Sequence, residues 1–267
     1  MSAPAPNLLP HLLWSLYRAV MLICGLAMLL TAAAANGPED LIRAYPDALD
    51  RIDGNALVWK DGTRMPIDDG RGPKPLAQLL DAPDLKDMFY ARYPRGAPEP
   101  PAPDSDPGRV RHAAFFDKMY GDCRTGGVQA HLVDIIWLPK KWGKPMQVTK
   151  INGVAERLAA VSLELDALPA SFDTYLWPPA GTFNCRVIAG TSRISAHGHG
   201  IAIDIATRHA HYWQWPKPAG HALPVWRNRI PLDIVEIFEK HGFIWGGRWH
   251  HYDTMHFEYR PELLAQR

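Results

Sequence analysis

A proline-rich stretch at residues 93–108 constrains the fold of this chain more than any other feature of its sequence. It reads YPRGAPEPPAPDSDPG and holds six prolines in sixteen residues. Proline has no backbone N–H to donate and its ring blocks helix, so the stretch must be a loop or linker. We therefore place a boundary there. It divides the chain into an N-terminal extension at 36–108 and a denser domain at 109–267.

The first 35 residues have the composition of a secretory signal. They contain no acidic residue and one strong base, Arg18, which is followed by an apolar run from Ala19 to Leu30. Small residues follow that run, so we expect residues 1–35 to be a signal peptide cleaved after Ala35. An uncleaved anchor is the alternative, although a membrane span needs about 20 apolar residues. The chain is therefore expected to be exported to the periplasm or cell envelope, with membrane contact only if this segment stays uncleaved.

The charge balance argues against a nucleic-acid-binding protein. The chain has 29 basic and 28 acidic side chains and a formal charge of +1. A nucleic-acid binder normally carries a clustered basic excess. We therefore expect no nucleic-acid partner.

Two cysteines, Cys123 and Cys185, remain after the expected signal peptide is removed. In an oxidising envelope compartment they can form one disulfide. The alternative is a pair of isolated, buried thiols. The sequence leaves both alternatives open.

Short periodic segments predict an α+β fold. In the extension, residues 56–67 read as a β-hairpin turned at Asp61-Gly62, and residues 76–90 have helical spacing interrupted by Pro83. Few helices, short strands and long loops are typical of the α+β class. In the second domain the expected strands are 147–151, 182–188, 201–205 and 255–259, and the expected helices are 154–168 and 231–241.

Two segments near the C-terminus concentrate imidazoles and carboxylates at the edges of predicted strands. They read SAHGHGIAID at 195–204 and WGGRWHHYDTMHFE at 245–258. A catalytic zinc takes three nitrogen or oxygen ligands from the protein and leaves one position open. The two segments together can supply such a set.

The glycines after His197 allow the chain to double back, so His197 and Asp204 can approach the same ion. His256 projects from one face of its predicted strand, while its neighbours point to the other face. Asp253 stands three residues before His256, close enough to reach a water on the metal. The prediction of a metal site depends on all four residues arriving together.

The order and spacing of these residues resemble the M15 metallopeptidases. The pattern is Ser-x-His-x-x-Gly-x-Ala-x-Asp, followed about 50 residues later by Trp-Gly-Gly-x-Trp and Asp-x-x-His-Phe-Glu. That family comprises D-alanyl-D-alanine carboxypeptidases and dipeptidases and L-alanyl-D-glutamate endopeptidases. The resemblance covers roughly residues 182–264. It implies an M15-like peptidase domain with a small antiparallel sheet, flanking helices, long loops and a zinc site at the sheet.

The resemblance also implies roles for particular residues. Asp253 is the implied catalytic base; carboxypeptidase members usually carry Glu there, whereas Asp resembles the endopeptidase branch. Glu258, or one of His250 and His251, is expected to orient a ligand. The implied Zn²⁺ ligands are His197, Asp204 and His256.

Family members often carry an arginine upstream of the histidine motif, where it pairs with substrate or stabilises an oxyanion. Arg186, on the strand expected at 182–188, is the preferred match, and Arg193 is its rival. His199 lies two residues from His197 and competes for the metal on spacing alone. The family pattern, however, has a variable residue at its place.

The expected function is zinc-dependent hydrolysis of peptidoglycan stem peptides, which agrees with export. Zinc lowers the pKa of a bound water toward ~7, and Asp253 would take the proton and pass it to the leaving amine. The same scaffold without hydrolysis would be a zinc-containing binding or signalling module. The presence of Asp253 favours the enzyme.

Overall fold

The computed structural model describes residues 36–215 and 225–265, and residues 36–266 form one compact unit. The signal peptide expected at 1–35 lies outside the described residues. Within 36–215 and 225–265, no helix has the length and apolar character that crossing a membrane requires.

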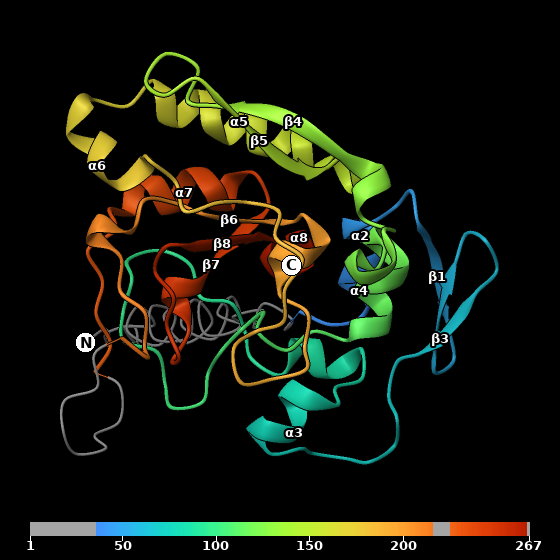
Figure 1. Cartoon of the computed structure of the whole chain (residues 1–267). Helices are drawn as coiled ribbons and strands as arrows, with labels where there is room; N and C mark the ends of the chain where they lie inside the picture. The colour runs from blue at the N-terminus through green and yellow to red at the C-terminus, as the bar shows by residue number, and fades with distance from the viewer. Residues whose placement is uncertain (1–35, 216–224, 266–267) are drawn as a thin grey trace, which may run out of the picture. The chain divides into compact units, whose positions relative to one another are not determined.

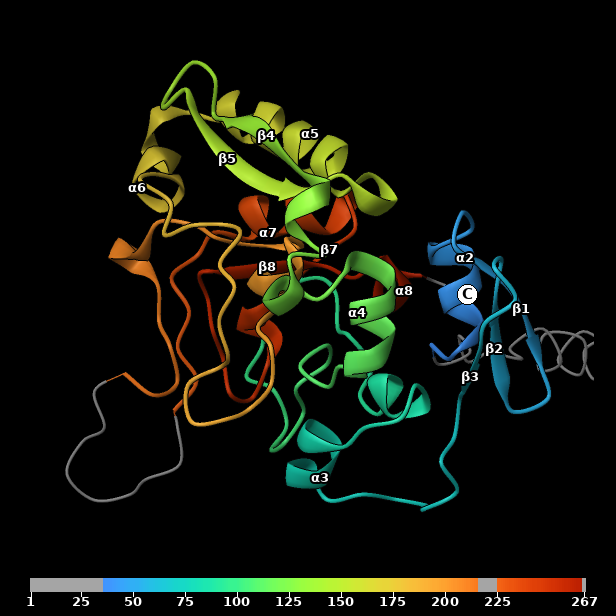
Figure 2. The same ribbon diagram turned by 45° about the vertical axis from the view of Figure 1, so that its right-hand side comes forward.

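Short helices alternate with short antiparallel strands, which confirms the α+β class with small antiparallel sheets (Figures 1 and 2). The helices of the described residues are α2 (Glu39–Ala44), α3 (Leu76–Asp81), α4 (Ala113–Tyr120), α5 (Val154–Asp166), α6 (Asp173–Leu176), α7 (Leu232–Lys240) and α8 (Pro261–Leu264). The strands are β1 (Leu49–Asp53), β2 (Ala56–Trp59), β3 (Arg64–Pro66), β4 (Leu132–Trp137), β5 (Lys144–Thr149), β6 (Ala202–Asp204), β7 (Phe243–Trp245) and β8 (His256–Tyr259).

A three-stranded sheet of order β6-β8-β7 forms the centre of the fold. β8 pairs antiparallel with both neighbours, and all four of its residues are buried. Helix α7 covers the sheet by stacking Phe238 on Phe257, with 3.8 Å between ring centroids. The helix begins after Pro231, as the sequence predicted. Proline suits the start of a helix because the N–H groups of the first turn have no partner within the helix, so its missing N–H costs no hydrogen bond.

A second layer is the β4–β5 hairpin with helix α5 lying along it (Figure 1). One stripe of α5 is buried against the core through Leu158, Val161 and Leu165. Positions three and four apart share one face of a helix, so this spacing gives the amphipathic helix that the sequence predicted. Strand β4, the partner of β5, was not predicted.

The N-terminal extension contributes to the same hydrophobic core as the rest of the unit. Its predicted hairpin is present as β2 and β3, and β1 adds a third strand. The rings of Tyr45 and Trp59 pack on Phe115 of α4, with centroid distances of 6.0 and 5.5 Å.

The proline-rich stretch has no helix or strand and packs against the central sheet. The Tyr93 hydroxyl accepts a hydrogen bond from the Trp245 N–H at 2.8 Å. The Trp249 indole donates to the Pro107 carbonyl at 2.7 Å. The prolines therefore shape a fixed surface loop. The boundary placed after residue 108, between the N-terminal extension and the second domain, stays a prediction.

The strand expected at 182–188 is wrong. Its backbone N–H groups bond to separate segments: Phe183 to the Gln147 carbonyl at 3.3 Å and Asn184 to the His197 carbonyl at 3.2 Å. One isolated antiparallel β-bridge, between Val187 and Ile194, pairs this segment with its neighbour. The segment has no alternating buried face, so a ladder with a single partner does not form.

The two remaining cysteines form a disulfide between Cys123 and Cys185. Of the two alternatives for these cysteines, the structure has the bonded one. The bond joins the irregular segment around Cys185 to the 3₁₀ turn that follows α4.

Candidate active site

Three side chains from the two histidine-containing segments meet at one end of the central sheet. Asp204 ends β6 and lies opposite His256, the first residue of β8. His197 lies in the 3₁₀ turn η6 (Ala196–His199), where the Ser195 hydroxyl accepts its N–H at 3.4 Å. The turn ends at Gly200 with φ +69°, where a Cβ would lie 3.0 Å from the Thr149 nitrogen. Glycine is required there for the chain to double back.

The three candidate ligand atoms lie within hydrogen-bond distance of one another. Asp204 Oδ1 is 3.1 Å from His197 Nε2 and 2.9 Å from His256 Nδ1. The two imidazole nitrogens are 3.2 Å apart. Four ligands placed tetrahedrally at about 2.0–2.1 Å from zinc are separated by about 3.3 Å. The spacing of the donor atoms therefore fits a zinc-sized ion, and the group belongs to those that could hold a metal.

Each imidazole has one nitrogen in the cluster and one outside it. The hydrogen bond that the outside nitrogen makes determines the tautomer, and so whether the nitrogen in the cluster has a free lone pair. His197 Nδ1 lies 2.5 Å from the Thr182 carbonyl, which can only accept, so Nδ1 carries the proton. His256 Nε2 lies 3.0 Å from the carboxylate of Glu258, so Nε2 carries the proton there. Both inner nitrogens then present lone pairs to the Asp204 oxygen. Such an arrangement needs a cation or an extra proton at its centre.

The charges around the cluster agree with this proton count. Burial disfavours charge on Glu258, but Arg111, His256 and Arg260 hold the pKa of that carboxyl well below its usual range. Burial also disfavours charge on His256, yet hydrogen bonds to Asp204 and Glu258 raise its pKa to about 10. In the metal-free protein His256 therefore carries the extra proton that the cluster needs.

A chain of buried charges continues from Glu258 away from the cluster. Arg260 donates to Glu258 at 3.1 Å and also to Glu262. Glu262 in turn accepts from the Tyr45 hydroxyl at 2.7 Å. Arg111 donates to both oxygens of Glu258, to Oε1 through Nε at 3.2 Å and to Oε2 through Nη2. The orientation of His256 therefore depends, through Glu258, on Tyr45 in the N-terminal extension and on Arg260 and Glu262 after β8.

Asp253 lines the same cavity as the three candidate ligands. Its Oδ1 is buried and has no hydrogen-bond partner among residues 36–215 and 225–265. Burial and the nearby charge of Asp204 raise the pKa of Asp253 to about 7. A carboxyl with a pKa near neutrality can both accept and release a proton at working pH.

The cavity has a volume of about 300 Å³ and opens between the sheet and the segment before His197. Arg186 lines it with an exposed side chain that makes no ion pair with any described residue. Its rival Arg193 does not line this cavity. Tyr212 and Trp215 form an aromatic wall, with ring centroids 6.0 Å apart.

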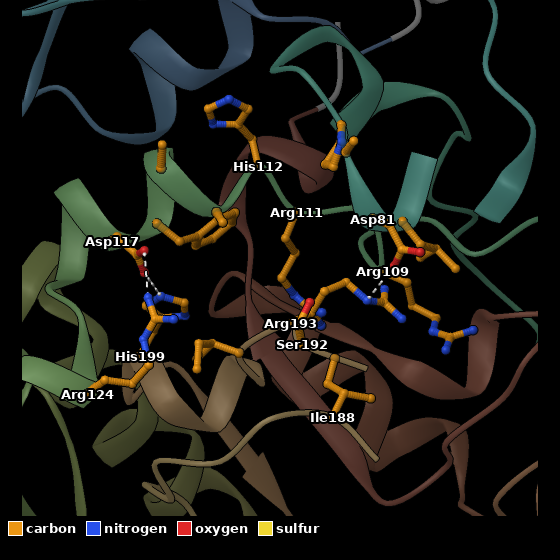
Figure 3. Close-up of a pocket in the computed structure, with 17 residues that line it drawn as sticks. Asp81, Arg109, Arg111, His112, Asp117, Arg124, Ile188, Ser192, Arg193 and His199 are labelled. Carbon is orange, nitrogen blue, oxygen red and sulfur yellow. Dashed lines mark hydrogen bonds and ion pairs between the residues drawn. The ribbon is translucent and has the colours of Figure 1, made fainter. Parts of the chain in front are cut away.

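The other histidines named from the sequence bond to groups outside the cluster, although His251 also lines the active-site cavity. His199 Nε2 lies 2.9 Å from Asp117 Oδ1 and faces a neighbouring cavity (Figure 3). His250 Nδ1 accepts the Asp104 N–H at 3.1 Å, and His251 Nδ1 lies 2.7 Å from Asp106. Of the candidates for orienting a ligand, Glu258 is the one that contacts a ring of the cluster.

Sequence reasoning missed the two arginines that follow the proline-rich stretch. Arg109 and Arg111 both line the active-site cavity. Their position 86 or more residues before His197 gives no local signal, because only the fold brings them to β8. The carbonyl of Thr182 was also missed, since any residue supplies a carbonyl.

A family model described as D-alanyl-D-alanine carboxypeptidase matches residues 189–259. The matched segment contains the three clustered side chains and Asp253, and it excludes Arg186. The resemblance expected from the motifs is thereby confirmed, and it supports a peptidase. No curated protein and no solved structure matches the chain.

Proposed function

We propose that this protein is an M15-type peptidase that hydrolyses stem peptides of peptidoglycan with a bound Zn²⁺, a proposal supported by the family model that matches residues 189–259. His197, Asp204 and His256 would hold the ion. The supporting observation is that two imidazole nitrogens and a carboxylate oxygen converge within 3.2 Å. Export through residues 1–35 would bring the enzyme to this substrate in the periplasm or cell envelope.

Zinc, when bound, supplies a Lewis acid and lowers the pKa of water toward ~7. The protein's own part begins with the Thr182 carbonyl and Glu258, which hold the two rings in one tautomer. Asp253 accepts the proton of the attacking water at Oδ1 and passes it to the leaving amine. In the metal-free protein its pKa is raised to about 7, and a carboxyl in this range can accept and release a proton near neutral pH.

Arg186 would bind the substrate from the other wall of the cavity. Its guanidinium is exposed and free of ion pairs within the described part of the chain. A guanidinium fork matches a carboxylate or a developing oxyanion. We therefore assign Arg186 to substrate or transition-state binding.

Two bonds are candidates for cleavage. The family description names D-alanyl-D-alanine carboxypeptidase activity. Aspartate rather than glutamate at position 253 resembles the L-alanyl-D-glutamate endopeptidase branch. Digestion of purified muropeptides by the zinc-loaded protein, with the products identified by mass spectrometry, distinguishes the two bonds.

The test of the mechanism is Asp253→Asn. The amide cannot accept a proton, so turnover should fall by about 10²–10⁴-fold while zinc content and fold are kept. Asp134→Asn, at an exposed position on β4, is the matched control and should leave turnover unchanged. Undiminished turnover in Asp253→Asn would show that another group is the base. Failure of the wild-type protein to cleave any muropeptide would favour the alternative, a zinc-containing binding module.

A further inference from the structure

A second cavity of about 300 Å³ adjoins the active-site cavity (Figure 3). Its walls come from residues 80–83, 109–117 and 188–199, with Arg124. The two cavities share Arg109, Arg111 and Ile188 as lining residues. The two cavities are therefore neighbours that share these side chains as part of their walls.

The lining of the second cavity carries more positive than negative charge. Four arginines line it, at positions 109, 111, 124 and 193, against the two carboxylates of Asp81 and Asp117. Asp117 is held by His199 at 2.9 Å. Three of the arginines are matched by acids at short range: Arg109 by Asp106, Arg111 by Glu258 and Arg124 by Asp122.

Arg193 is the arginine whose charge is least compensated. Its Nε is buried and makes no hydrogen bond with residues 36–215 or 225–265. The nearest acid is Asp81, 3.3 Å away, on a side chain that is 70% exposed. The distance is measured from Arg193 Nε to Asp81 Oδ1, so the two groups form an ion pair, and solvent around the exposed Asp81 weakens it. Burial and the like charges of Arg109 and Arg111 lower the pKa of Arg193.

Figure 3 shows Arg111 and Arg193 side by side in the cavity, with a dashed line that joins Arg193 to Asp81. Helix α4 also begins here, and its first residues, Ala113 and Ala114, line the wall. The N-terminal end of a helix carries a partial positive charge that attracts anions. The guanidinium donors and the helix end therefore favour the same kind of ligand.

We propose that this second cavity is a subsite in which Arg193 binds a carboxylate of an acidic peptide substrate. In this proposal the peptide bond to be cut lies at the zinc cluster, so the subsite rests on the function proposed above. Arg186 and Arg193 then have different tasks, the first beside the reacting bond and the second at an acidic residue further along the peptide. Asp81 is displaced from Arg193 when the carboxylate binds.

The kinetic test uses two synthetic stem-type peptides that differ in one group, a carboxylate in the first and a carboxamide in the second. Arg193→Gln should raise KM for the carboxylate peptide by about tenfold or more, the loss expected for one charge-assisted hydrogen bond. KM for the carboxamide peptide should stay within about twofold. Arg193→Lys should restore part of the preference, because it keeps the charge but not the fork. Arg208→Gln removes an exposed charge outside both cavities and is the matched control.

A binding test separates the subsite from catalysis. Titration calorimetry in the Asp253→Asn background measures the affinity of both peptides without turnover, so it decides the subsite even if no bond is cut. Selective loss of carboxylate affinity on Arg193→Gln supports the proposal. Equal weakening of both peptides would mean that Arg193 only supports the fold, and no change would mean that it binds nothing; either overturns the proposal. Binding of inorganic phosphate without discrimination between the peptides would also overturn it.

Discussion

The disulfide between Cys123 and Cys185 should carry a large share of the stability of this protein. The perturbation is the double substitution Cys123→Ser with Cys185→Ser, which leaves no unpaired thiol. The two cysteines are 62 residues apart in the sequence. In the chain-entropy model a crosslink at that separation destabilises the unfolded chain by about 4 kcal/mol. Domains of ordinary size are stable by about 5–15 kcal/mol. The variant should therefore still fold, but it should unfold at a lower urea concentration than the wild-type protein.

Urea unfolding followed by tryptophan fluorescence measures the effect, since the chain has ten tryptophans. With an m-value near 3 kcal/mol/M, a loss of about 4 kcal/mol lowers the midpoint by about 1.3 M. The m-value itself should rise, because the uncrosslinked chain exposes more surface when unfolded. Zinc must be held at one concentration throughout, because ligand binding adds its own stabilisation.

The wild-type protein reduced before unfolding is the control and should match the double serine variant. A difference below about 1 kcal/mol between oxidised and reduced protein would refute the loop-entropy reasoning. The bond also anchors the irregular segment that carries Arg186 beside Cys185. Peptide KM should therefore rise in the variant even in the absence of urea.

The remaining predictions concern the metal. His256→Ala should lower bound zinc from about one ion per chain to near zero, because two ligands hold zinc poorly; full zinc by elemental analysis would remove His256 from the ligand set. Glu258→Gln should weaken zinc about 10–100-fold and cost about 3–5 kcal/mol, since Arg111 and Arg260 lose a buried partner; chelator competition and urea unfolding measure both, with exposed Glu236→Gln as control. At pH 8 zinc uptake should release at least one proton per chain, because the pKa of His256 is raised to about 10 in the metal-free protein. Stability from that proton is full below the unfolded value of about 6.5 and is lost as pH rises through 10, so a metal-free protein equally stable at pH 6 and pH 10 would contradict this reasoning.

The sequence predicted that His197, Asp204 and His256 would lie close together, because the geometry that joins them is mostly local. A glycine turn and one short strand bring His197 to Asp204, and a single antiparallel pairing places His256 opposite. Hydrophobic spacing likewise predicted α5, and Pro231 and Gly242 predicted where α7 begins and ends. These elements depend on neighbours that are close along the chain.

What the sequence did not predict depends on distant contacts. The segment 182–188 has strand-like composition, but its backbone bonds go to several partners and the disulfide fixes its course. Strand β7 has three residues, too few to show alternation. Arg109 and Arg111 reach the active-site cavity through packing against segments 80 or more residues away in the sequence, which no periodic pattern encodes.

The buried charge chain that runs from Glu258 to Tyr45 sets a lower limit on the smallest fragment that can fold. A protein cut to the family-matched residues 189–259 would keep the Glu258 carboxylate and discard Arg111, Arg260 and Tyr45. Isolated burial of such a charge is costly enough that the strand would open or the carboxyl would take up a proton. Expression trials should therefore begin upstream of α2 and end beyond α8, and a shorter product should lose its ability to retain metal before it loses solubility.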